Sequence, residues 1–206
     1  MLPKQDNLPL ARRMAVEGLL KSDPAERAAR GGGRFEPGAN SKSRTGVRYL
    51  GREVRLSLPG GTMETPGGGG PLSLREEILI LHYLERASGL PPTGNWISFA
   101  EIPGGAFYHP VFLQRSKASL VKFFGENPQR LLALASEEVR GEPWDMGDTG
   151  VKIQAFPRVA LGMVLWKGDA EFPPEGNVLF DSSVIGYLPV EDIVILAETV
   201  VWRLIK

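Results

Sequence analysis

The sequence predicts an α+β fold in which an antiparallel sheet packs against helices and an N-terminal helical arm precedes the main domain. Segments with helical spacing and segments with alternating apolar residues come in clusters rather than in strict alternation, which favours this class over a parallel α/β fold. Two strand-like runs, residues 150–156 and 159–166, are separated only by Pro157 and Arg158. Such close spacing predicts an antiparallel hairpin.

The arm is expected to comprise residues 1–45, and residues 46–206 are expected to form a single α+β domain. Apolar side chains recur at helical spacing in residues 8–21. An Asp-Pro pair then provides an N-cap and a first turn for a short helix at residues 24–30. The polar, glycine-rich segment that follows is expected to be a flexible linker to the domain.

The first part of the domain combines a hairpin with the most clearly predicted helix. Apolar residues alternate through residues 47–58 on both sides of Gly51, which indicates a hairpin or a bulged strand. After a glycine-rich loop, Ser73 and Glu76 have the spacing of a capping box, and Gly89 is placed to end the helix. Apolar residues cover most of the circumference of this helix, so we expect it to be buried.

The remaining elements follow in order. An extended segment is expected at residues 93–105. The stretches 109–125 and 128–141 are each expected to contain a helix that ends at a glycine. The two hairpin strands come next. A last helix is predicted near residues 189–204, with acidic residues in its first turn, where the helix dipole favours negative charge.

The composition is that of a globular protein with a sizeable core. Apolar residues make up 42% and charged residues 23% of the 206 residues. The chain contains no cysteine, which excludes disulfides, zinc–thiolate sites, iron–sulfur ligation and cysteine nucleophiles in this sequence. This composition fits a cytoplasmic protein. No run of residues is long and apolar enough for a membrane span, and the charged N-terminus lacks the apolar core of a signal peptide.

The net charge of zero hides an asymmetry. Residues 1–55 carry 12 basic and 6 acidic side chains, whereas residues 56–206 carry 12 basic and 18 acidic ones. A basic front can indicate an anionic partner. The basic residues are scattered and lack interleaved aromatics, so a solvated segment, or attraction between the two parts, is favoured and nucleic-acid binding is not expected.

An acidic loop between two apolar runs is the first candidate site. Asp169 and Glu171 are two residues apart, so in an extended segment they point the same way, and Asp181 closes the next apolar run. Three carboxylates could hold a hard cation such as Mg²⁺ or Ca²⁺. The Pro173–Pro174 pair instead indicates a structural turn, and this interpretation is favoured.

Arg158 stands at the tip of the predicted hairpin. Its guanidinium could form a bidentate salt bridge with the acidic loop, or it could bind a carboxylate or phosphate of a ligand. The salt bridge is the favoured expectation because carboxylates crowd the neighbouring sequence. We therefore expect the arginine and the acidic side chains to share one rim, beside an aromatic segment.

That aromatic segment is the second candidate site. Trp96, Phe99, Phe107 and Tyr108 surround Glu101 in the sequence, which suggests an aromatic-lined ligand pocket with one carboxylate. A sheet face packed under a loop has the same composition and is favoured. His109 precedes a proline and is expected in a loop, where it would be freer for acid–base chemistry or axial ligation of a corrinoid or haem.

Two long blocks resemble a known family. "LHYLERASGLPPTGNWISFAEIPGG" and "FPRVALGMVLWKGDAEFPPEGNVLFDSSVIGYLPVED" are similar to the domain of unknown function 3786, over roughly residues 8–204. The resemblance implies a family of anaerobic bacteria and archaea. It also implies that some members join this domain to a four-cysteine iron–sulfur module of the kind found in corrinoid proteins of one-carbon metabolism. This chain lacks those cysteines, so redox chemistry would come from a corrinoid or iron–sulfur protein partner.

Three functional hypotheses follow. The first is a non-catalytic accessory module of anaerobic one-carbon or corrinoid metabolism that binds a ligand or partner through residues 96–109 and 158–181. The second is a metal-assisted enzyme in which the carboxylates of the acidic loop hold the ion and His109 or Glu101 is the base. The third is a protein-interaction scaffold that uses the basic arm. The sequence identifies no cofactor, substrate or oligomeric state.

Overall fold

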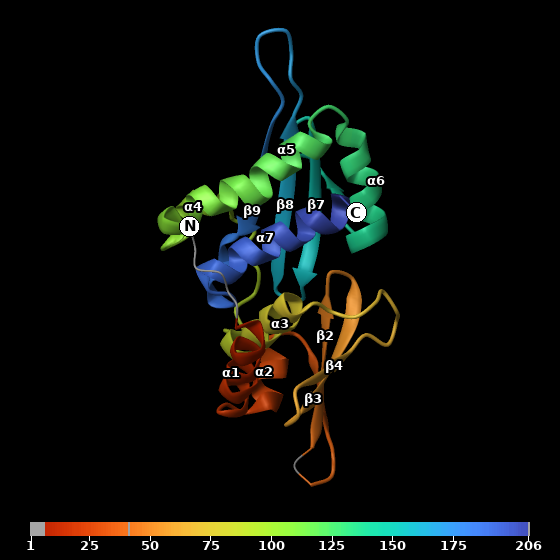
Figure 1. The fold of residues 1–206 in the computed structure, drawn as a ribbon, viewed down its shortest axis with the longest axis vertical. Coiled ribbons are helices and arrows are strands. Elements are labelled where there is room, and N and C mark those ends of the chain that lie inside the picture. The colour runs from red at the N-terminus through yellow and green to blue at the C-terminus, as the bar shows by residue number, and fades with distance from the viewer. Residues whose placement is uncertain (1–6, 41, 206) are drawn as a thin grey trace.

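The protein is built from two antiparallel sheets placed one above the other along the long axis of the molecule (Figure 1). The structure is a computed structural model and describes residues 7–40 and 42–205. It confirms the predicted α+β class. The lower sheet is four-stranded with its strands in sequence order. Its strands are β1 (Arg34–Pro37), β2 (Ser43–Tyr49), β3 (Arg52–Leu58) and β4 (Thr62–Glu64).

The upper sheet is five-stranded and has the order β5-β9-β8-β7-β6. The predicted hairpin about Pro157 and Arg158 is confirmed as the β7–β8 pair. The short strand β5 forms one edge of this sheet, where it pairs with β9. The strands are β5 (Trp96–Ser98), β6 (Glu142–Trp144), β7 (Thr149–Phe156), β8 (Val159–Trp166) and β9 (Glu175–Asp181).

Three helices accompany the lower sheet: α1 (Leu8–Leu20), α2 (Pro24–Arg30) and α3 (Leu74–Arg86). The predicted capping box of α3 is confirmed, since Ser73 and Glu76 each accept from the backbone N–H of the other. The apolar side chains of α3 from Ile78 to Leu84 are buried, as expected for a central helix. α1 packs against α3.

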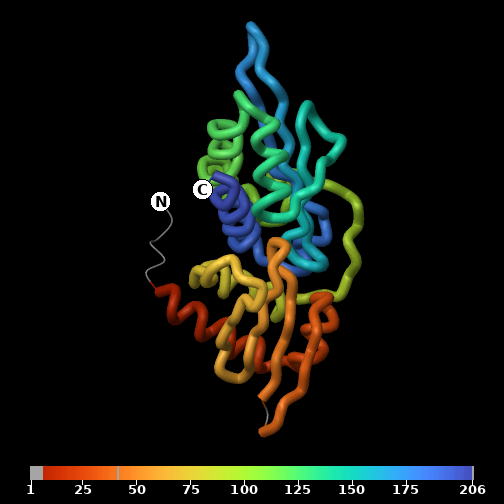
Figure 2. The backbone as a smooth tube through the Cα atoms, turned by 90° about the vertical axis from the view of Figure 1, so that its right-hand side faces the viewer, coloured from red at the N-terminus to blue at the C-terminus, as the bar shows by residue number. Residues whose placement is uncertain are grey.

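The other helices cover one face of the upper sheet (Figures 1 and 2). They are α4 (Gly105–Phe112), α5 (Ala118–Phe124), α6 (Pro128–Val139) and α7 (Val190–Ile205), and one π-helical turn at Leu113–Lys117 joins α4 to α5. The helix predicted within residues 109–125 starts earlier, at Gly105. His109 therefore lies in α4, and its assignment to a loop was wrong. The reason is Gly104, whose φ of 79° begins the helix before Pro110 is reached.

The segment expected to be a flexible linker is instead largely strand. β1 pairs with the first half of β2, with Arg34 opposite Gly46 and Pro37 opposite Ser43. Edge strands such as β1 are held by backbone hydrogen bonds and need no apolar alternation, which is why the polar sequence did not reveal them. β2 runs across residue 45, and the division of the chain into an arm and a domain stays a prediction.

A continuous aromatic core joins the two halves of the protein. The rings of Tyr83 and Phe156 stack with centroids 4.1 Å apart, and Tyr49 and Tyr187 extend the cluster on either side. The backbone N–H of Leu50 also donates to the carbonyl of Ala155 in the upper sheet. Within the described residues, the longest apolar helical stretches fall short of the length needed to cross a membrane.

Candidate functional site

The structure separates the residues that were expected to share one rim. Arg158 precedes β8 and Asp169 follows it, so they lie at opposite ends of that strand. Asp181 ends β9, which runs antiparallel to β8, and this places it at the Arg158 end, away from Asp169 and Glu171. The three carboxylates therefore do not converge on one cation, as the alternative metal hypothesis required. Within residues 7–40 and 42–205, no group of three or more His, Asp or Glu side chains is arranged to hold a metal ion.

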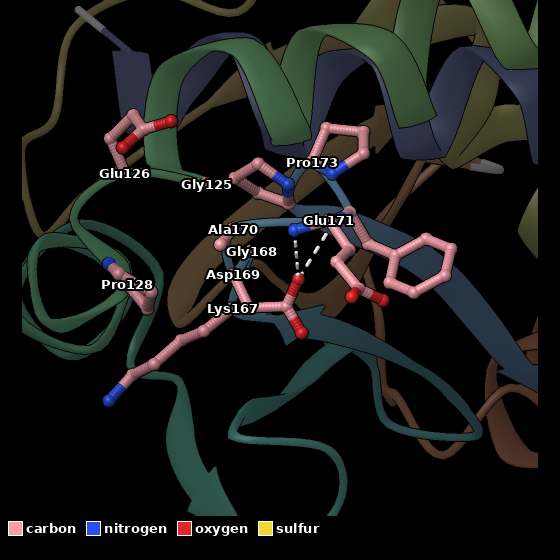
Figure 3. Close-up of a pocket in the computed structure, with 11 residues that line it drawn as sticks. Gly125, Glu126, Pro128, Lys167, Gly168, Asp169, Ala170, Glu171 and Pro173 are labelled. Atoms are coloured by element: carbon pink, nitrogen blue, oxygen red, sulfur yellow. Dashed lines mark hydrogen bonds between the residues drawn. The ribbon is translucent and has the colours of Figure 1, made fainter.

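The acidic loop forms a well-defined turn beside a pocket of about 580 Å³ (Figure 3). The pocket lies between the β8–β9 loop and the start of α6. The Oδ1 atom of Asp169 accepts hydrogen bonds of 2.8 Å from the backbone N–H groups of Glu171 and Phe172. These bonds lower the pKa of Asp169. The carboxylate is therefore used to close its own turn, as the structural interpretation expected.

Asp181 is a structural carboxylate at the other end of β9. It is 2% exposed and accepts hydrogen bonds from the backbone N–H groups of Thr93, Gly94 and Ser183. Burial by itself would raise the pKa of Asp181, but these hydrogen bonds together lower it to about 2. Asp181 thereby attaches the loop before β5 to the sheet.

Arg158 does not form the salt bridge that was expected. Its backbone N–H donates to the hydroxyl of Tyr83, with the two atoms 3.2 Å apart, at the junction between the two halves of the protein. Among the described residues, no carboxylate lies within ion-pair distance of its guanidinium. The acidic loop is out of reach because the length of β8 separates the two.

The aromatic segment does not form a single pocket, because its side chains point to different parts of the protein. Phe99 is buried and stacks on Phe112 with ring centroids 4.3 Å apart. The carboxylate of Glu101 is exposed and accepts hydrogen bonds of 2.7 Å from the backbone N–H and the hydroxyl of Ser98, which lower the pKa of Glu101. Phe99 is therefore part of the core, and Glu101 caps the turn after β5.

Tyr108 and His109 lie on α4, at the helix-covered side of the sheet. The Tyr108 hydroxyl donates to the Glu191 carboxylate in the first turn of α7, at 2.5 Å. His109 is half-buried, and its ring centroid lies 6.5 Å from that of Phe99. Tyr108 therefore links α4 to α7, whereas His109 packs beside Phe99.

Trp96 instead lies on the face of the upper sheet that the helices leave uncovered. Alternation along β5 directs Ile97 toward the core and Trp96 to the opposite face. The ring centroids of Trp96 and Trp144 lie 4.5 Å apart, and the two ring planes are inclined by 46°. The Nζ atom of Lys152 lies 5.6 Å from the Trp96 centroid, in the range of a cation–π contact.

We call this surface the tryptophan face and define it by Trp96, Trp144, Lys152 and Leu179. Lys152 and Leu179 are both paired with Gly162 of β8, so the four side chains project from neighbouring strands on one side of the sheet. A Cβ atom on Gly162 would lie 2.2 Å from the Trp144 ring. The glycine therefore lets the indole lie directly on the strand backbone. Both tryptophans are half-buried, so part of each ring remains accessible.

Sequence reasoning selected Trp96 but missed the other members of the tryptophan face. Two signals were present: a glycine in the middle of an apolar strand, and an outward-pointing Lys152 in the alternation of β7. Neither signal identifies its partner, because the Trp96–Trp144 contact depends on strand order. Two tilted indoles beside an ammonium group are suited to a flat conjugated ring that carries negative charge.

Comparison with known proteins adds one finding. The model of a family described as "Domain of unknown function (DUF3786)" matches residues 23–203, which is most of the chain. Searches of curated proteins and of solved structures found no match.

Proposed function

Since the chain belongs to the family of the domain of unknown function DUF3786, we propose that it is a non-catalytic binding module of anaerobic one-carbon or corrinoid metabolism. Its tryptophan face holds a flat conjugated ligand such as a corrinoid or a folate. The observation that carries the proposal is the contact between Trp96 and Trp144 on a sheet face that the helices leave uncovered. The metabolic setting, a cytoplasmic location and the anaerobic source rest on the sequence and on the resemblance described above.

The chemistry of the face favours a flat ligand with an anionic group. Stacking on an aromatic side chain contributes about 1 kcal/mol beyond the burial of apolar area. Lys152 stands beside Trp96 and could pair with a carboxylate of a folate or with the phosphate of a corrinoid. The face is built on paired strands, which hold both indoles in place before a ligand arrives.

The other polar groups support binding rather than catalysis. Glu101, a candidate base, caps the turn after β5, and Asp181 is surrounded by backbone N–H groups. Neither carboxylate is free to take a proton from a substrate at the tryptophan face. Redox chemistry in this setting comes from a corrinoid or iron–sulfur protein partner, because this chain has no cysteine to hold a cluster.

Fluorescence titration tests the proposal directly. The chain has four tryptophans, so a Trp166→Phe/Trp202→Phe variant leaves only the pair in the tryptophan face as fluorophores. Addition of hydroxocobalamin, folic acid or haemin, with correction for ligand absorbance, should give saturable quenching with at least one of them. Trp96→Ala in the unmodified chain should weaken that binding at least tenfold by calorimetry, which corresponds to about 1.4 kcal/mol.

The same titration can exclude the proposal. Trp202→Ala is the matched control, because Trp202 is 43% exposed on α7 and packs near Phe123. This variant should bind as the unmodified chain does. If none of the three ligands produces saturable quenching or heat, the ligand-binding function is wrong.

A further inference from the structure

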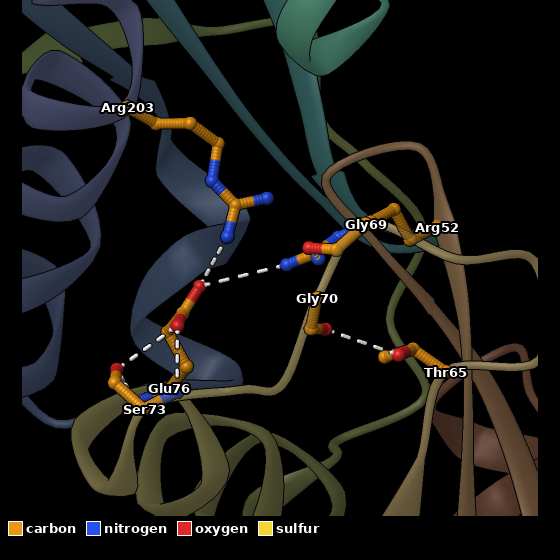
Figure 4. A network of polar contacts seen from close by, with 7 residues as sticks. All are labelled: Arg52, Thr65, Gly69, Gly70, Ser73, Glu76 and Arg203. Carbon is orange, nitrogen blue, oxygen red and sulfur yellow. Dashed lines mark hydrogen bonds and ion pairs between the residues drawn. The ribbon is translucent and has the colours of Figure 1, made fainter. Parts of the chain in front are cut away.

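A second polar cluster lies where the two sheets meet, and it has an unequal charge balance (Figure 4). Arg203 from the last turn of α7 donates to Oε1 of Glu76, and Arg52 at the start of β3 has Nη2 3.8 Å from the same oxygen. Oε2 of Glu76 accepts from the backbone N–H and the hydroxyl of Ser73, each at 2.9 Å. Both oxygens of this one carboxylate therefore already have partners.

Two guanidinium groups share that single carboxylate, which leaves one positive charge in excess. The side chains of Arg52 and Arg203 are only 17% and 19% exposed. No other carboxylate of residues 7–40 and 42–205 comes within ion-pair distance of either arginine. Burial makes an excess charge unfavourable unless an anion neutralises it.

Two buried polar atoms in the same cluster lack a hydrogen-bond partner. They are Nε of Arg52 and the hydroxyl oxygen of Tyr49. Tyr49 is opposite Arg52 in the β2–β3 pair and fully buried, and the guanidinium carbon of Arg203 lies 5.8 Å from its ring centroid. Nε of arginine can only donate a hydrogen bond, so its missing partner must be an acceptor. Glu76 does not supply that acceptor, because its contact with Arg52 is through Nη2 and not through Nε.

The glycine-rich loop beside Arg52 packs closely against the guanidinium group. The carbonyl of Gly69 accepts from Nη1 of Arg52, and a Cβ atom on Gly69 would lie 2.6 Å from the arginine side chain. Glycine at this position is therefore required for the close approach. At Gly67, Gly68 and Gly70 a Cβ atom would meet no atom within 4 Å. These three glycines of the loop therefore border open space.

We propose that this cluster is a binding site for an oxyanion, namely the phosphate or carboxylate group of a small ligand. Arg52 and Arg203 supply the charge and the paired N–H donors that match an oxyanion, and the Tyr49 hydroxyl donates a further hydrogen bond. Glu76 orients the two guanidinium groups from below. The site is independent of the tryptophan face, because α7 covers the opposite face of the upper sheet (Figure 2).

Thermal melting and calorimetry with simple anions test the site. Inorganic phosphate, sulfate and acetate are titrated against the full chain, with chloride at equal ionic strength as the reference. A saturable rise in melting temperature with phosphate or acetate, beyond that with chloride, is the expected result. Phosphate acting alone identifies a phosphorylated ligand, and acetate acting alone identifies a carboxylate ligand.

A pair of buried tyrosines provides the variant and its control. Tyr49→Phe removes a hydroxyl that has no protein partner, so the melting temperature in chloride should not fall, whereas anion affinity should fall about tenfold. Tyr83→Phe removes a hydroxyl that bonds to the Gly31 carbonyl at 2.7 Å. It should lower the melting temperature in chloride and leave anion affinity unchanged.

Two results would overturn the site. One is a melting temperature that responds equally to phosphate, sulfate, acetate and chloride. Such a result indicates screening of charge, or a buried water in place of an anion. The other is unchanged anion affinity in both Tyr49→Phe and Arg203→Gln. Either result leaves the fluorescence titration of the tryptophan face unaffected, so failure of the two proposals can be told apart.

Discussion

The Nδ1 atom of His82 lies 2.6 Å from Oδ2 of Asp192, and this contact joins α3 to the first turn of α7. It is one of several polar links between the part of the protein that holds the lower sheet and the part that holds the upper one. Asp192 is buried and His82 is partly buried. The hydrogen bond to Asp192 raises the pKa of His82 and outweighs the opposing effect of burial; Glu85 raises this pKa further, and Arg86 lowers it.

This pair predicts that the protein is more stable in mild acid than in mild alkali. A raised pKa in the folded state means that the stabilising contribution is fully present below the unfolded-state pKa of about 6.5 and is lost as the pH rises through the folded-state value. Asp192→Asn should lower the free energy of unfolding at pH 6 by about 1–3 kcal/mol and flatten this pH dependence. Urea unfolding between pH 5.5 and 9 measures both effects.

His109→Gln is the control for that experiment, because it changes the only other histidine of the chain. Its stability should follow the same pH profile as the unmodified protein. A pH profile of Asp192→Asn that parallels the unmodified one would show that the His82–Asp192 contact is not the source of the dependence.

Asp181 predicts a second, acid-dependent contribution to stability. Its pKa of about 2 is below the ordinary value, so the contribution is present above pH 4 and is lost as the pH falls toward 2. Asp181→Asn should lower the free energy of unfolding near neutral pH by about 1–3 kcal/mol, because the buried backbone donors lose a charged acceptor. Hydrogen exchange of Thr93 and Gly94 should quicken. Asp169→Asn, in an exposed turn, should leave the melting temperature nearly unchanged.

The contact between Gly162 and the Trp144 ring predicts that a larger residue at position 162 will disturb the tryptophan face. Gly162→Ala places a methyl group 2.2 Å from the Trp144 ring, so the indole must move. The expected cost is about 1–3 kcal/mol of stability, with a shift of the tryptophan emission maximum and loss of ligand binding. Gly67→Ala is the matched control because nothing lies within 4 Å of the added atom. An unshifted spectrum in Gly162→Ala would contradict the described position of Trp144.

Tyr83 predicts a structural effect that contrasts with that of Tyr49. The hydroxyl of Tyr83 donates to the Gly31 carbonyl and accepts from the backbone N–H of Arg158, so it bridges the arm and the β7–β8 turn. Tyr83→Phe leaves buried backbone groups without partners and should cost about 1–3 kcal/mol, measured by urea unfolding. A loss below the error of the measurement would mean that water replaces the hydroxyl at this junction.

Local signals explain which elements could be predicted. The capping box of α3 and the β7–β8 hairpin depend on residues a few positions apart, and both predictions are confirmed. β1 could not be found in this way, because an edge strand is held by backbone pairing that leaves little trace in side-chain pattern. The start of α4 was misplaced because Pro110 outweighed the less visible effect of a left-handed Gly104.

The sequence alone determined the fold class, most helices, the absence of cysteine chemistry and Trp96 as a candidate binding residue. Only the tertiary structure decided which polar and aromatic groups meet. Antiparallel strands place residues that are close in sequence at opposite ends of a sheet, as with Asp169 and Asp181, and strand order brings distant residues such as Trp96 and Trp144 together. A binding site depends on such distances in space, which spacing along the chain does not specify.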